Sequence, residues 1–164
     1  MKGENFHPDI IQNLTLPPVE LKICRRNDVY KVFDPLRKNY FILTNEEFVR
    51  QSFVAWLIKD LGYPKSLMAN EIGIRLNNLY KRCDTVVFSN SGTPLMIIEY
   101  KSPTVAITQE VFDQIVRYNM VLNAKFLTVS NGINHYCCQI DSANNGYHFL
   151  SEFPSYEFLK NYDN

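Results

Sequence analysis

Three charged side chains, Asp84, Glu99 and Lys101, are spaced so that a β-hairpin would bring them together. The apolar and β-branched runs on either side of residues 90–94 are typical of two strands, and the Asn-Ser-Gly-Thr-Pro between them is typical of a turn. Because side chains alternate across a strand, Glu99 and Lys101 share one face while Tyr100 points to the other. A hairpin that turns here sets Asp84 roughly opposite Glu99 and Lys101, so that two carboxylates and an ammonium group converge.

Carboxylates that converge in this way favour a bound cation. Two of them within about 4 Å repel by roughly 4 kcal/mol at an effective dielectric constant near 20. Mg²⁺ takes oxygen ligands and binds through one or two carboxylates plus a substrate phosphate, so Asp84, Glu99 and the carbonyl group of Tyr100 are predicted to hold it. Lys101 is expected to orient a water molecule, to accept its proton or to stabilise charge on a phosphate. The alternative is a salt-bridge cluster of Asp84, Glu99 and Lys101 on an ordinary hairpin.

The elements that must position the hairpin have patterns of a mixed α/β fold. Thr44 is predicted to cap a helix that ends at Gly62, and Glu47 completes a capping box. A helix that begins near Thr108 and leads to a further strand would make a βαβ crossover, in which the two strands are parallel. The core strands are expected at Ala69–Leu76, Thr85–Phe88, Leu95–Ile98 and Lys125–Ser130, which gives the order αβββαβ.

The rest of the chain adds smaller elements to this core. Two short strands, Glu20–Cys24 and Val29–Phe33, are predicted to form a small N-terminal β extension. Further strands and a short terminal helix are expected at His135–Ile140, Tyr147–Leu150 and residues 154–162. We divide the 164 residues into an arm, 1–20, and a single domain, 21–164, because a chain of this length with 46% hydrophobic residues suffices for one core.

Composition limits the environment and the partners of the protein. No apolar run is long enough to span a membrane and the N-terminus does not resemble a signal peptide, so a cytoplasmic protein is expected. The four cysteines have no CxxC spacing and are interpreted as free thiols, and the three histidines form no zinc pattern. The formal net charge of zero predicts weak binding to nucleic acid, with contacts only where basic residues gather, at 22–38 and 75–82.

A set of motifs in this chain resembles a known family. Asp84 followed by Glu99-Tyr100-Lys101 is similar to the D…ExK signature of the PD-(D/E)xK nucleases, without the proline of that name. Over roughly residues 34–140 the chain resembles the N-terminal nuclease domain of type I restriction enzyme R subunits. The segments that carry this resemblance are Thr44–Gln51, Gly62-Tyr63-Pro64, Arg82-Cys83-Asp84, Ile98–Lys101, Gln114 with Tyr118, and Ser130-Asn131-Gly132.

The resemblance implies a fold and an activity. The fold is a restriction-endonuclease-like core, a central mixed β-sheet flanked by helices. The activity is Mg²⁺-dependent endonucleolytic cleavage of DNA, with Mn²⁺ as a substitute, in a restriction system whose other subunits are possible partners. The oligomeric state stays open, a homodimer included. No glycine-rich phosphate loop is present, so ATP-driven translocation is not expected of this chain. The alternative function is a catalytically silent module of the same fold that binds nucleic acid or a restriction-system partner.

The resemblance also implies roles for further residues. Glu47 is the best match to the acidic residue that helps to organise the metal from the first helix, with Glu46 as the second match and simple helix capping by Glu47 as the alternative. Gln114 and Tyr118, one helical turn apart, are expected to hold the strand backbone or a phosphate, or to be incidental polar residues of an amphipathic helix. DNA contacts are predicted at Arg50, Lys81 and Arg82.

Overall fold

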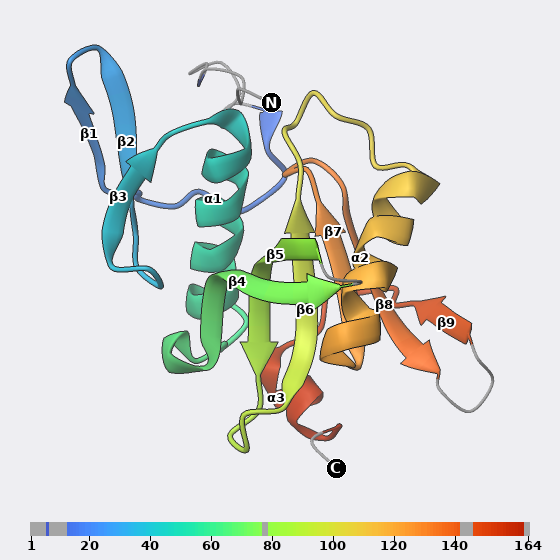
Figure 1. Ribbon diagram of the computed structural model, residues 1–164. Coiled ribbons are helices and arrows are strands. Elements are labelled where there is room, and N and C mark those ends of the chain that lie inside the picture. Colours follow the sequence, from blue (N-terminus) through green and yellow to red (C-terminus); the bar gives the residue numbers. More distant parts are fainter. Residues whose placement is uncertain (1–5, 7–12, 77–78, 142–145, 163–164) are drawn as a thin grey trace.

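The computed structural model describes residues 6, 13–76, 79–141 and 146–162, which fold into two sheets with helices packed against the larger one (Figure 1). The smaller sheet has the order β1-β2-β3 and the larger one the order β4-β5-β6-β7-β8-β9. The helices are α1 (Asn45–Lys59), α2 (Gln109–Leu122), α3 (Tyr156–Lys160) and the 3-10 turn η2 (Lys65–Leu67). The strands are β1 (Ile23–Arg26), β2 (Val29–Asp34), β3 (Asn39–Ile42), β4 (Met68–Leu76), β5 (Leu79–Phe88), β6 (Pro94–Tyr100), β7 (Phe126–Ser130), β8 (His135–Asp141) and β9 (Gly146–Phe149).

The larger sheet has the predicted mixed topology. Every neighbouring pair is antiparallel except β6 and β7, which are parallel and connected through α2. The core therefore follows the order α1-β4-β5-β6-α2-β7, and the prediction of a mixed α/β fold with this αβββαβ order is confirmed. The crossover matters for the site because it returns the chain across the sheet and sets α2 beside the carboxyl end of β6.

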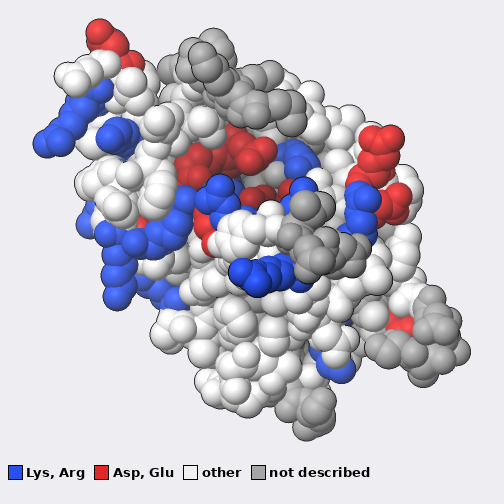
Figure 2. All heavy atoms as spheres, in the orientation of Figure 1, with Lys and Arg blue, Asp and Glu red and all other residues white. Residues whose placement is uncertain are grey.

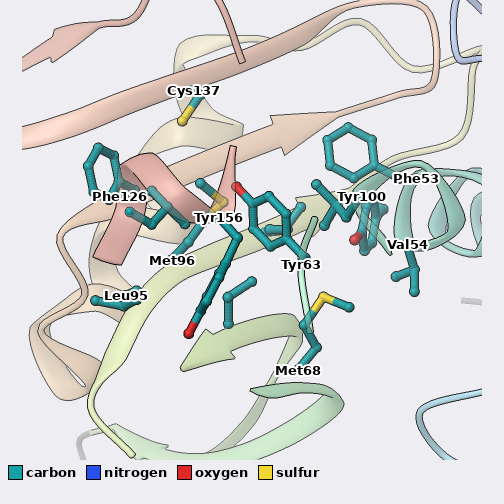
Figure 3. Packing of buried hydrophobic residues seen from close by; sticks show 14 of the residues in the cluster. Phe53, Val54, Tyr63, Met68, Leu95, Met96, Tyr100, Phe126, Cys137 and Tyr156 are labelled. Carbon is teal, nitrogen blue, oxygen red and sulfur yellow. The ribbon is translucent and has the colours of Figure 1, made fainter. Parts of the chain in front are cut away.

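Helices cover both faces of the larger sheet. On one face, the core includes Phe53 and Leu57 from α1 and Leu159 from α3, packed against Tyr100. Figure 3 shows aromatic side chains meeting there: the rings of Phe53 and Tyr100 lie 5.6 Å apart, as do those of Tyr63 and Tyr156. On the other face, the apolar side of α2 packs on residues of β5, β6 and β7. These two layers fix β6 between them, so the residues at its end have little freedom to move.

Helix α1 begins where the sequence predicts. Thr44 is its N-cap, and its side chain accepts a hydrogen bond from the backbone N–H of Glu47 at 3.1 Å. Gly62 follows the helix with φ of +72°, a conformation that glycine adopts without steric cost. The helix is buried along much of its length, and its first turn lies against the site described below.

The N-terminal part of the chain differs in detail from expectation. The smaller sheet has a third strand, β3, which was not predicted because it is only four residues long and follows the Asp34-Pro35 break. Most of the expected arm, residues 1–12 except Phe6, lies outside the described residues. The C-terminal end of the arm is fixed to the domain, because the backbone N–H of Thr15 donates to the carbonyl group of Gly132 and Leu16 is buried in the core.

All four cysteines are free thiols, as predicted. Among the helices that the structure describes, none has the length and apolar character needed to cross a bilayer.

Candidate functional site

Asp84, Glu99 and Lys101 meet at one end of the β5–β6 hairpin. The register pairs Thr85 with Ile98, so Asp84 and Glu99 are the next residues on their strands. The backbone N–H of Tyr100 donates to Oδ2 of Asp84 at 2.8 Å, and Nζ of Lys101 donates to Oε1 of Glu99 at 2.9 Å. Figure 2 shows red carboxylates gathered in a hollow on this side of the molecule, with blue basic side chains around it. The convergence predicted from the hairpin is therefore present in the structure.

Gln114 and Tyr118 lie beside Glu99. Nε2 of Gln114 donates to Oε1 of Glu99 at 2.6 Å and to the hydroxyl oxygen of Tyr118 at 3.0 Å. The partner of Gln114 is thus a carboxylate of the cluster, not the strand backbone. Lys101 and Gln114 both occupy Oε1, whereas Oε2 of Glu99 is buried and has no hydrogen-bond partner among the described residues. Two hydrogen bonds therefore hold the Glu99 carboxylate in one orientation, and they leave Oε2 without a donor among the described residues.

Burial, and next the charge of Asp84, raises the pKa of the Glu99 carboxyl to about 7. The pKa values of Lys101 and Glu99 are both raised, but for different reasons. Burial lowers the pKa of Lys101, but the carboxylates of Glu99, Glu46 and Asp84 together outweigh burial and raise it overall. The carboxylate is the more deeply buried partner, at 6% side-chain exposure against 21% for the lysine, so Glu99 bears the larger desolvation cost. Near neutral pH, Glu99 is therefore poised between its neutral and charged forms.

Arg50 lies inside the cluster. Its side chain is 4% exposed, and its guanidinium group makes ion pairs of 2.8 Å with Glu47, Glu71 and Asp84. Burial lowers the pKa of Arg50, but the three carboxylates outweigh burial and raise it. This geometry differs from the one expected for a DNA contact, because the guanidinium group is committed to carboxylates. A phosphate contact at Arg50 stays a prediction that the present arrangement does not favour.

The two glutamates of the first turn of α1 have different surroundings. The carboxylate of Glu47 accepts hydrogen bonds from Arg37, Arg50 (2.8 Å) and Gln51 (2.9 Å). This carboxylate is thus enclosed by donors. Burial, and next the charge of Asp84, raises the pKa of Glu46, with Lys101 acting in the opposite direction. The charges that act on Glu46 thus include those of Asp84 and Lys101 in the hairpin site, and which of the two glutamates serves as the helix acid stays a prediction.

Glu71 is a member of the cluster that the sequence analysis did not single out. It lies in β4 between the pairs Asn70–Thr85 and Ile72–Cys83, which places it opposite Asp84. Its φ is +59°, a left-handed conformation that costs a glutamate about 1 kcal/mol or more. Its carboxylate bridges Arg50 at 2.8 Å and Arg82 at 3.1 Å. A lone glutamate within a strand pattern carries no signal of such a role.

Lys81 and Arg82 lie at the rim of the site. Both are exposed, and the Arg82 side chain keeps 62% of its surface open although it pairs with Glu71. Tyr100, expected to offer its carbonyl group, buries its side chain completely and uses its N–H to hold Asp84. Within the described residues, no three His, Cys, Asp or Glu side chains are already gathered as a ligand set for a metal. The Arg50 contact with Asp84 and the Lys101 contact with Glu99 occupy one oxygen of each carboxylate.

Comparison with known proteins places this site within a matched region. The sequence model of the family described as "Type I restriction enzyme R protein N terminus (HSDR_N)" matches residues 36–154, which include every residue of the cluster. A fragment of a candidate HsdR subunit of a type I restriction enzyme from Vibrio vulnificus YJ016 is similar in structure, with a TM-score of 0.52 and 19% identity. That match covers 70% of this chain but only 24% of the Vibrio chain, so the present chain spans about a quarter of its length.

A second solved structure is a candidate nuclease of the family DUF820 from Anabaena variabilis ATCC 29413. It has a TM-score of 0.46 and 11% identity, and the match covers 84% of this chain and 88% of that one. No protein with a curated description is significantly similar in sequence.

Proposed function

Because this chain belongs to the family of type I restriction enzyme R protein N termini, we propose that it is a nuclease module that hydrolyses DNA phosphodiester bonds. Mg²⁺ is the proposed cofactor, with Mn²⁺ as a substitute, and Asp84, Glu99 and Lys101 carry the chemistry. The observation that carries the proposal is the Glu99 carboxylate. One of its oxygens is fixed by Lys101 and Gln114, while the other is buried and has no partner among the described residues.

A divalent cation fits this carboxylate pair. A buried acceptor without a donor costs about 1–3 kcal/mol, and a cation between Glu99 and Asp84 would satisfy it. The same cation would offset the charge of Asp84, which contributes to the raised pKa of Glu99. Mg²⁺ prefers oxygen ligands and binds through one or two carboxylates with a substrate phosphate. Asp84, Glu99 and the carbonyl group of Tyr100 are the proposed ligands, with Glu46 beside them.

When bound, Mg²⁺ would lower the pKa of a water molecule and offset charge on the scissile phosphate. Lys101 supplies a positive charge next to Glu99. Because its pKa is raised, it stays protonated at neutral pH, so it stabilises negative charge on the phosphate instead of accepting a proton. Gln114 is a positioning residue, because it holds Glu99 in the orientation that leaves Oε2 open. Tyr118 in turn fixes the Gln114 amide.

DNA is the proposed substrate because the carboxylate hollow has exposed basic residues at its rim. Lys81 and Arg82 are exposed there and would meet phosphates. The formal net charge of zero predicts that duplex binding by this chain alone is weak and falls steeply with salt. Other subunits of a restriction system would then supply the remaining affinity.

One observation favours the alternative, a catalytically silent nuclease-fold module that binds nucleic acid or a restriction-system partner. Arg50 already places a cation at 2.8 Å from Asp84, and its two further carboxylates hold it there. A guanidinium group that stays in this position would neutralise Asp84 without any metal. The two functions differ in whether the cluster binds a divalent cation and cleaves DNA.

Cleavage assays on supercoiled plasmid with 5 mM Mg²⁺ or Mn²⁺ test the proposal. We expect nicking or linearisation by the wild type and a loss of at least about a hundredfold in Asp84→Asn, Glu99→Gln and Lys101→Ala. Asp113→Asn is the matched control, because Asp113 is an exposed carboxylate of α2, one residue from Gln114. Its activity should equal that of the wild type. Cleavage that persists in Asp84→Asn, or a wild type without cleavage in either metal, would refute the nuclease assignment.

A further inference from the structure

The outer face of the small sheet has a distinct set of side chains. Because residues paired across antiparallel strands share a face, the pairs Cys24–Lys31 and Lys31–Ile42 place these three residues on one side. Alternation adds Arg26 and Tyr40 to the same side, through their pairs with Val29 and Phe33. The opposite side contains Val32, which is buried against Leu43 and Phe48. We call the first side the outer face.

The outer face is basic and has no acidic residue. Asp28 lies in the β1–β2 turn and pairs with Arg25, and Asp34 is buried and pairs with Arg37. Within the described part of the chain, Arg26 and Lys31 have no carboxylate at ion-pair distance. Arg25, Arg37 and Arg50, in contrast, all have one. The charges of the outer face are therefore available to an anionic partner.

Exposed apolar and aromatic side chains lie beside these charges, on the edge strand β3. Tyr40 is 44% exposed and Ile42 is 60% exposed. The Tyr40 ring meets Phe33 edge-on at 5.3 Å, and Nζ of Lys22 lies 5.7 Å from the centre of the Phe33 ring. Phe33 and Lys22 also line a cavity of about 320 Å³ between this sheet and α1, which Lys59 and Lys65 border as well. The outer face thus continues into a pocket lined by Phe33, three lysines and one acidic residue, Glu20.

We propose that the outer face of the small sheet, with the adjoining pocket, binds single-stranded DNA. An unpaired nucleotide offers a flat base that stacks on Tyr40 and a phosphate that meets Arg26, Lys31 or the pocket lysines. A duplex presents its phosphates but keeps its bases stacked inside, so it would leave Tyr40 and Ile42 unused. The proposal deepens the proposed function and rests on it only in the choice of DNA as the ligand.

The test is fluorescence anisotropy of a labelled 20-nucleotide oligo(dT) in EDTA, so that no metal and no cleavage are involved. Because the alanine removes the ring on which a base would stack, Tyr40→Ala should weaken binding by about tenfold, and Tyr40→Phe should restore it. The matched control is Tyr147→Ala, because Tyr147 is a tyrosine of β9 with 46% exposure. It should bind like the wild type. Arg26→Gln should weaken binding and lower its salt dependence.

A duplex of the same length should bind more weakly and be indifferent to Tyr40→Ala. The inference is overturned if the wild type does not bind oligo(dT), if Tyr40→Ala and Tyr147→Ala weaken binding equally, or if polyglutamate competes as well as unlabelled oligo(dT). The last result would identify an acidic protein surface as the partner. Loss of oligo(dT) binding in Tyr40→Ala without any nuclease activity would support this inference while refuting the proposed function. DNA cleavage by the wild type, together with oligo(dT) binding that Tyr40→Ala does not change, would support the proposed function and refute this inference.

Discussion

Replacement of Glu99 by glutamine should stabilise the protein at alkaline pH in the absence of metal. The wild-type Glu99 side chain is 6% exposed, and burial followed by the charge of Asp84 raises the pKa of its carboxyl group from 4.5 to about 7. Glutamine has nearly the same shape, and its amide oxygen can still accept from Gln114. It removes the charge that the folded state accommodates poorly.

The raised pKa sets both the sign and the size of the effect. Stabilisation by the protonated Glu99 is fully present below its unfolded-state pKa and is lost as the pH rises through about 7. Since one pKa unit corresponds to about 1.4 kcal/mol, the wild type should lose about 2–3 kcal/mol relative to Glu99→Gln between pH 5 and pH 8. The hydrogen bond from Lys101 is among the causes that set the pKa of Glu99, so its loss in the variant is already contained in this pH-dependent difference.

Urea unfolding in EDTA at intervals between pH 5 and pH 8 measures this difference. The difference in free energy of unfolding, variant minus wild type, should increase with pH and level off above pH 7. Glu110→Gln, which changes an exposed carboxylate of α2, should give a curve parallel to that of the wild type. If the Glu99→Gln difference is constant across the range, or increases toward acid, Glu99 titrates in its ordinary range and the carboxylate is not poised for a cation.

Two further predictions concern the same cluster. The apparent affinity for Mn²⁺, followed by electron paramagnetic resonance, should weaken about tenfold per pH unit below pH 7 and level off above it, because each bound ion must displace the proton of Glu99. An affinity that does not depend on pH would contradict this linkage. Arg50→Gln should lower the free energy of unfolding by about 3–5 kcal/mol, because it strands buried carboxylates, whereas Arg82→Gln, at an arginine with 62% exposure, should cost less than about 1 kcal/mol. Equal losses in urea unfolding would show that Arg50 does not neutralise the cluster.

The sequence could predict the hairpin because the information for it is local. A turn of five residues between two apolar runs brings the two strands together, and a register shift between Val87 and Phe88 then sets Thr85 opposite Ile98. Alternation along β6 then separates Glu99 and Lys101 from Tyr100, which is buried against Phe53. The QxxxY spacing placed Gln114 and Tyr118 on one side of α2, and the structure adds that this side meets Glu99.

The choice between Glu46 and Glu47 could not be made from the sequence. Both lie in the first turn of α1, and adjacent residues of a helix point about 100° apart. Which one faces the sheet depends on how the helix is rotated when it packs. The capping pattern drew attention to Glu47, whose carboxylate is bound by Arg37 from the loop after β2 as well as by Arg50 and Gln51. That loop carries no sequence signal for this contact.

The carboxylate partners of Arg50 and the presence of Glu71 in the cluster escaped prediction for a related reason. Arg50 lies 34 residues from Asp84 in the chain and matched a family motif without a stated partner. Glu71 reaches it from β4, where it lies opposite Asp84 with φ of +59°. A left-handed residue within a strand departs from the regular extended backbone, so the direction of its side chain cannot be read from alternation.

Although the formal net charge is zero, the acidic and basic side chains are separated in space. This separation affects how metal and DNA would bind together. Carboxylates gather in the hollow, where Arg50 and Lys101 neutralise part of their charge, while Arg26, Lys31 and Lys81 are at the surface. DNA can therefore approach basic groups outside the hollow without any metal. A scissile phosphate placed between Asp84 and Glu99 would meet like charge, and only a divalent cation bound there would reverse the sign. If the proposed function holds, binding at the rim and entry into the hollow would be separable steps, and the second one would depend on the metal.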